Sequence, residues 1–202
     1  MHRRDNRGSL AINGRVQTMK WVTRDFVHLD RVASPWLIKR FIDREAVFVF
    51  VPWGEEGRRP ADAIPFALPG AELGPHDHEG TTFAKLLKKY RLDDPALRLI
   101  AGVIAAGVDY VLHDYRPPSD DRLGQMAVGL LAISEGTMLI NEDDAMIIER
   151  SLPLYDALYA YFTAHELARA KGVPLPKPAG RGPTNETLHL RGLLKTAMQP
   201  ER

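Results

Sequence analysis

Two short segments of this chain hold side chains that commonly bind metal ions. Residues 28–31 read His-Leu-Asp-Arg, and residues 72–80 read Glu-Leu-Gly-Pro-His-Asp-His-Glu-Gly. The second segment offers two imidazoles and three carboxylates, a donor set that suits Zn, Mn, Fe or Ni better than the all-oxygen sites of calcium. Its spacing matches no established metal motif, so a solvated polar loop is the alternative interpretation.

The first segment combines potential metal ligands with an arginine. His28 and Asp30 are two residues apart, so on an extended chain they point to the same side and can share one ligand or metal. Arg31 and Arg40 can both face an anion near a helix N-terminus, where free N–H groups favour negative charge. The structural alternative is that Asp30 bonds to nearby backbone and that Arg40 forms a surface ion pair.

Two further groups of polar residues are weaker candidates. His113 and Asp114 are adjacent, and a carboxylate can orient an imidazole, although an exposed loop pair explains them equally. Tyr155 and Tyr159 are i, i+4 neighbours on a predicted helix, where core tyrosines with hydrated hydroxyls are the alternative. The sequence has no Walker loop, dinucleotide-binding glycine motif or serine-hydrolase elbow.

The elements that must position these residues begin with two strands and a helix. The pattern of β-branched and aromatic residues predicts strands over 21–29 and 46–51, the second one buried because its apolar run is uninterrupted. Ser34 followed by Pro35 predicts a helix start there, with the helix ending near Asp43. The prolines and glycines of residues 52–81 predict mostly loop.

Four more helices are predicted downstream, and they set the fold class. They begin at a Thr82 cap, at Asp94-Pro95, near Ser119 and at the acidic cap of residues 141–144. The last should run to about Lys171, kinked or divided at Pro153. We therefore predict a helix-dominant α+β fold, with a small sheet from the first half packed against about five to six helices.

The domain boundaries follow from composition. Residues 1–18 lack hydrophobic periodicity and are predicted to be disordered, residues 19–172 form the domain, and residues 173–183 are a Pro/Gly linker. Residues 184–202 form an amphipathic helix whose stripe includes Leu190, Leu193 and Leu194. That stripe must pack on the body or on a partner, so a homo-oligomer formed through this helix is one expectation.

Charge and hydropathy exclude several partners. The net charge is +1, but residues 21–170 contain 16 basic and 23 acidic residues, which argues against nucleic-acid binding by the body. No apolar run approaches the roughly 20 residues of a membrane span, and the N-terminus lacks the apolar region of a signal peptide. We expect a cytoplasmic protein without a membrane partner. The absence of cysteine excludes disulfides and thiolate metal sites.

Several segments resemble the C-terminal domain of the ChrB family of chromate-resistance proteins. The most specific are residues 21–24 (Trp-Val-Thr-Arg) and 28–43, and the similarity continues through segments within residues 48–83, 129–134 and 154–159. The family pattern places a His shortly after the Glu matched by Glu72. His76 supplies it, with His78 as the alternative because this loop is about one residue longer. The resemblance implies a role in chromate resistance or sensing. Longer members have a DNA-binding domain before this one, and we do not extend its DNA-binding role to this chain.

Three hypotheses follow for function. In the first, His28, Glu72 and His76 bind a divalent transition metal, Asp30 and Tyr155 act as acid–base groups, and Arg31, Arg40 and Trp36 bind a small anionic substrate. Under this hypothesis the domain is a metal-binding protein of the chromate-resistance type and a candidate metal-dependent enzyme. The second is a metal-free sensor of a chromate-like or sulfate-like oxyanion, using Arg31 and Arg40. The third is an interaction module without a small-molecule site.

Overall fold

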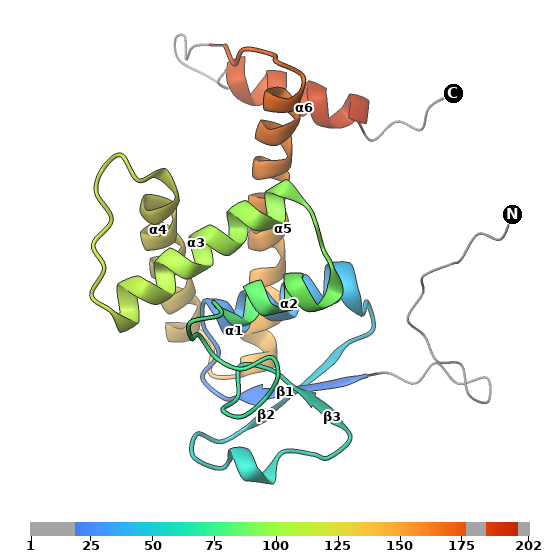
Figure 1. Cartoon of the computed structure of the whole chain (residues 1–202), viewed down its shortest axis with the longest axis vertical. Helices are drawn as coiled ribbons and strands as arrows, with labels where there is room; N and C mark the ends of the chain where they lie inside the picture. Colours follow the sequence, from blue (N-terminus) through green and yellow to red (C-terminus); the bar gives the residue numbers. More distant parts are fainter. Residues whose placement is uncertain (1–18, 177–184, 198–202) are drawn as a thin grey trace, which may run out of the picture.

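The computed structural model describes residues 19–176 and 185–197, in which a small sheet lies at one end of a helical body (Figure 1). Its strands β1 (Lys20–Arg24), β2 (Val47–Val51) and β3 (Ala63–Pro65) are parallel in the order β2-β1-β3. Six α-helices account for most of the remaining described structure. The predicted helix-dominant α+β class is confirmed.

The central strand is shorter than predicted, and the second strand is less buried. β1 ends at Arg24 because Arg31 donates hydrogen bonds to the carbonyls of residues 24, 25 and 26 and folds the chain into a turn there. β2 matches the predicted segment but is an edge strand, with Val47 exposed and Val51 buried. The short strand β3 and the 3-10 turn Glu56–Arg58 interrupt the predicted loop.

The first helix begins five residues earlier than predicted, with Leu29 and not Ser34 as its N-cap. Helix α1 spans Asp30–Leu37 and continues as a π-helical segment over Ile38–Ile42, so Pro35 lies inside it and not at its start. The carbonyl of Leu29 already accepts the first helical bonds, from Val32 and Ala33 at 3.0 and 2.8 Å. The hydroxyl of Ser34 donates to Asp30 (3.3 Å) and does not cap the helix. The predicted end near Asp43 is confirmed.

The four central helices are α2 (Thr82–Tyr90), α3 (Pro95–Leu112), α4 (Arg122–Leu139) and α5 (Asp144–Ala170). Each starts at a side chain that accepts a backbone N–H bond: Thr81, Asp94, Asp121 and Asp143. The first cap is therefore Thr81, one residue before the predicted one. α5 is continuous through Pro153, so the predicted division into two helices is wrong, and the alternative of a kink at Pro153 stays a prediction. Proline has no N–H, so the backbone carbonyl four residues earlier receives no helical hydrogen bond. Because Pro153 is exposed, water can bond to that carbonyl instead.

The core is centred on Trp36 of α1. Its ring stacks with Phe83 of α2 and Tyr155 of α5, with ring centroids 6.4 and 5.9 Å apart. In contrast to the expectation that no segment approaches a membrane span, α3 is long and apolar enough to cross a membrane by length and composition alone. In this fold its stripe of Leu97, Ile100, Val103 and Ile104 is buried in the same core.

Helix α6 (Asn185–Ala197) lies across the far end of α5 (Figure 1). Leu190, Leu193 and Leu194 pack against Ala164 and Ala168 of α5, so the predicted stripe is covered by the chain's own body. Residues 1–18 and part of the predicted linker lie outside the described residues.

Candidate functional site

A cavity of about 110 Å³ lies where the turn after β1, the loop before α2 and the last turns of α3 meet. Four of the residues selected from the sequence line it: His28, Asp30, Arg31 and His76. The remaining lining residues are Arg24, Leu29, Ala67, Pro75, Val108, Val111 and Leu112.

Three side chains of types that can bind a metal ion form a cluster beside the cavity. His76, Asp109 and His113 each offer one ligand atom, and these atoms all lie within 4.8 Å of one another. The Asp109 carboxylate is 3.6 Å from Nε2 of His76 and 3.0 Å from Nδ1 of His113. Two ligands of one tetrahedral zinc ion lie roughly 3.4 Å apart, so small side-chain rotations would bring all three onto one ion.

The sequence indicated only part of this cluster. Asp109 was not selected, although Asp109 and His113 are i, i+4 neighbours at the end of α3 and so share a face. His113 bonds to Asp109, whereas Asp114, its predicted partner, forms an ion pair with Arg116. The Glu72 carboxylate is exposed and pairs with Lys89, and Glu72 is not part of the cavity lining.

Asp30 is buried and holds the start of α2. Its carboxylate accepts hydrogen bonds from the backbone N–H groups of Thr82 (2.8 Å) and Phe83 (3.0 Å) and from the hydroxyl of Ser34. Burial raises the pKa of Asp30, and these hydrogen bonds oppose that shift. The carboxylate therefore joins α1 to the helix that follows the His76 loop, and its catalytic role stays a prediction.

Tyr155 holds the backbone of Leu29, which has φ 46° and ψ −108°. Its hydroxyl donates to the Leu29 carbonyl (3.3 Å), and the Leu29 N–H donates to Ser134 (3.0 Å). Burial, and then the charge of Asp30, raise the pKa of the Tyr155 hydroxyl. A bulky residue at positive φ is strained, and such strain concentrates at functional sites. The acid–base role predicted for Tyr155 is not tested by these contacts.

Trp36 and Arg40 share Asp156 on α5. The Trp36 indole N–H and Nε of Arg40 each donate to one carboxylate oxygen at 2.8 Å, and a second Arg40 nitrogen reaches the other oxygen at 2.9 Å. The Arg40 side chain is therefore engaged in a bidentate pair outside the cavity, whereas Arg31 lines it. The predicted joint role of Arg31 and Arg40 in anion binding stays a prediction that these contacts do not support.

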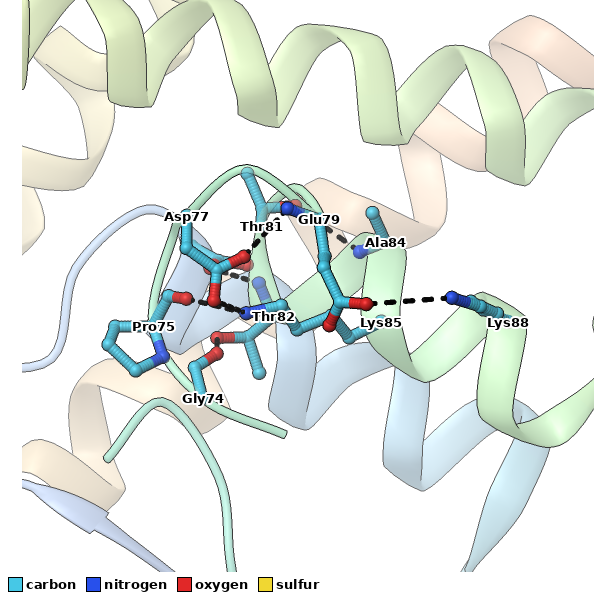
Figure 2. A network of polar contacts seen from close by, with 10 residues as sticks. Gly74, Pro75, Asp77, Glu79, Thr81, Thr82, Ala84, Lys85 and Lys88 are labelled. Atoms are coloured by element: carbon cyan, nitrogen blue, oxygen red, sulfur yellow. Dashed lines mark hydrogen bonds and ion pairs between the residues drawn. The ribbon is translucent and has the colours of Figure 1, made fainter. Parts of the chain in front are cut away.

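The loop that carries His76 is held by a buried lysine (Figure 2). Lys85 of α2 is 7% exposed, and its ammonium donates to the Pro75 carbonyl (2.8 Å) and to Asp77 (2.6 Å), the two neighbours of His76. The Thr82 hydroxyl donates to the Gly74 carbonyl at 2.8 Å. These bonds hold the backbone before His76 and the side chain of the residue after it.

Three buried nitrogens on cavity-lining residues have no hydrogen-bond partner among the described residues: Nε of Arg24, Nδ1 of His28 and Nδ1 of His76. Buried polar atoms are rarely unpaired in native proteins, so a water molecule or a ligand is the expected partner of each nitrogen. Burial, and then the charge of Arg31, lower the pKa of His28, which favours its neutral form.

The comparisons with known proteins identify the family. The sequence model of "ChrB, C-terminal domain" matches residues 21–162. The chain belongs to the ChrB C-terminal domain family. It is 33% identical over 150 residues to "Protein ChrB" of Cupriavidus metallidurans, and this match covers 73% of the chain and 42% of that relative. The ChrB domain described here thus spans less than half the length of the curated relative. No solved structure matches it significantly.

The support from Lys85 leads to a first prediction. We expect Lys85→Met to weaken metal binding about tenfold, because the bonds to Pro75 and Asp77 that hold the His76 loop are lost. Lys88→Met is the matched control, since Lys88 lies on the same helix, is 82% exposed and pairs with the exposed Glu79. Titration of both variants with Zn²⁺ tests this, and equal affinities would contradict it.

Proposed function

We propose that the ChrB domain binds one divalent transition metal ion through His76, Asp109 and His113 and that this site serves chromate resistance. Family membership supports the role related to chromate resistance. The metal proposal is carried by one observation, the convergence of two imidazoles and a carboxylate within 4.8 Å. A set of two histidines and one carboxylate is typical of Zn and Fe sites, and Mn and Ni also accept these donors.

The position of the cluster supports a reactive or sensory site more than a purely structural one. Structural zinc sites usually have four protein ligands, whereas three ligands leave a coordination position for an external molecule. His76 belongs both to the cluster and to the cavity lining, so an external ligand in the cavity would lie beside the metal. We therefore retain the hypothesis of a metal-dependent enzyme acting on a small anionic substrate.

Elemental analysis of untagged protein tests the proposal. After incubation with Zn²⁺, Mn²⁺, Fe²⁺ or Ni²⁺ and dialysis, we expect about one equivalent of a preferred metal in the wild type and a large loss in Asp109→Asn and His113→Ala. Asp114→Asn is the control, because Asp114 is adjacent to His113 but pairs with Arg116. A wild type that retains no metal would overturn the proposal.

A further inference from the structure

The wall of the cavity is mostly apolar, and this limits the ligands that it can accept. Its apolar lining residues are Leu29, Ala67, Pro75, Val108, Val111 and Leu112. A bare inorganic oxyanion is hydrated on every side, and such a wall offers no hydrogen bonds to replace that water. An organic ligand with one polar end gains from contact with these side chains, and the volume of about 110 Å³ suits a small one.

Arg24 is the candidate for binding the polar end of such a ligand. The guanidinium carbon lies 3.7 Å from the centre of the Trp53 ring, and one terminal nitrogen is 3.4 Å from Glu56. These contacts fix the guanidinium plane, and the buried Nε has no partner within residues 19–176 and 185–197. His28 also lines the cavity, and its buried Nδ1 has no partner in the same part of the chain.

Arg31 adds positive charge beside Arg24. Both residues line the cavity, and Arg31 donates a hydrogen bond to the Arg24 carbonyl at 3.3 Å. Burial, and then the charge of Arg24, lower the pKa of Arg31. Arg31 donates to main-chain carbonyls, while the carboxylate of Asp30 is directed at the start of α2. Arg24 and Arg31 both line the cavity, so an acidic group on the ligand would meet two guanidinium groups there and would compete with Glu56 for Arg24.

We propose that this cavity binds a small carboxylate with an apolar body, the carboxylate on Arg24 and His28 and the body against Val108, Val111 and Leu112. The inference rests on the proposed function for the position of the ligand beside the metal, and it adds the chemical class of that ligand. Binding by Arg24 and His28 does not itself require the metal.

Calorimetric titration of the full chain with isobutyrate, acetate and sulfate tests this class, with zinc-loaded and zinc-free protein in parallel. We expect isobutyrate to bind about tenfold more tightly than acetate, since it buries two more carbons, and sulfate to bind most weakly. Val111→Thr should reduce the preference for isobutyrate over acetate about threefold to fourfold, because a methyl contact is lost.

Arg24→Gln should weaken isobutyrate binding at least about tenfold through loss of a charge-assisted hydrogen bond. Arg58→Gln is the control, because Arg58 is exposed and pairs with Glu55 outside the cavity. If Arg24→Gln does not fold, Arg24→Lys serves in its place, since it keeps the charge but lacks the Nε donor.

The outcomes separate this inference from the metal proposal. Zinc binding without carboxylate binding, sulfate binding as tight as isobutyrate binding, or an unchanged affinity in the Arg24 variants would overturn the inference alone. Isobutyrate binding to a protein that retains no zinc would support the inference and contradict the metal proposal.

Discussion

We expect His76→Ala to bind Zn²⁺ at least about a hundredfold more weakly than the wild type. His76 is the ligand that the loop contributes, whereas Asp109 and His113 both come from the end of α3. Its loss leaves two ligands on one helix turn. Removing a group that only hydrogen-bonds to a metal ligand already lowers metal affinity roughly tenfold to a hundredfold, so removing a ligand should cost at least as much. Competition against a chromophoric chelator measures the affinity.

The matched control for this prediction is His78→Ala. His78 lies two residues further along the same loop but is exposed and is not part of the cluster. We expect its variant to bind Zn²⁺ like the wild type, which would decide between the two histidines that the sequence left open. A weaker affinity in His78→Ala than in His76→Ala would contradict the proposed ligand set.

The largest effect on stability is expected from Asp30→Ala, a loss of about 3 kcal/mol in the free energy of unfolding. The substitution leaves the N–H groups of Thr82 and Phe83 buried without an acceptor, and each such group costs roughly 1–3 kcal/mol. Urea unfolding followed by circular dichroism measures the change. Asp62→Ala is the control, since Asp62 is an exposed partner of Lys20 and its loss should leave the free energy of unfolding nearly unchanged.

The pH dependence of stability provides a second test of Asp30. A carboxyl group whose pKa is raised in the folded state favours folding at low pH, and this contribution is lost as the pH rises through the folded pKa. The wild type should therefore lose stability relative to Asp30→Asn as the pH increases above about 4. Unchanged stability in Asp30→Ala would show that the carboxylate does not hold α2 and would leave it available for the predicted catalytic role.

Periodicity and capping residues predicted most of the helical body. Asp94 caps α3 as expected, and α5 ends near Lys171 because local signals there agree with the tertiary packing. The first helix was mispredicted because Ser34-Pro35 is a strong local start signal, whereas the actual start depends on Leu29. The conformation of Leu29 is held by Ser134 and Tyr155, more than 100 residues away, so no local pattern can reveal it.

The sequence predicted those residues of the candidate site that lie together in short polar segments, and it missed those that only folding brings near them. Residues 28–31 and His76 were selected, and the fold brings them to one cavity. Glu72 was selected through the family pattern, but its carboxylate pairs with Lys89. Asp109 was missed because it follows an apolar stripe on α3, and its nearness to the His76 loop arises only when α3 packs beside that loop. Arg24 was missed for a similar reason, since its unpaired Nε is visible only in the folded chain.

The central claim is tested most directly by the visible absorption spectrum of the untagged ChrB domain loaded with Co²⁺. We predict about one tightly held equivalent of Co²⁺, with absorption bands typical of a four- or five-coordinate site with nitrogen and oxygen ligands. These bands should be absent from His76→Ala and His113→Ala and unchanged in His78→Ala. A wild-type protein that shows only the weak spectrum of hydrated Co²⁺ and loses the ion on dialysis would contradict the claim that His76, Asp109 and His113 form a metal site.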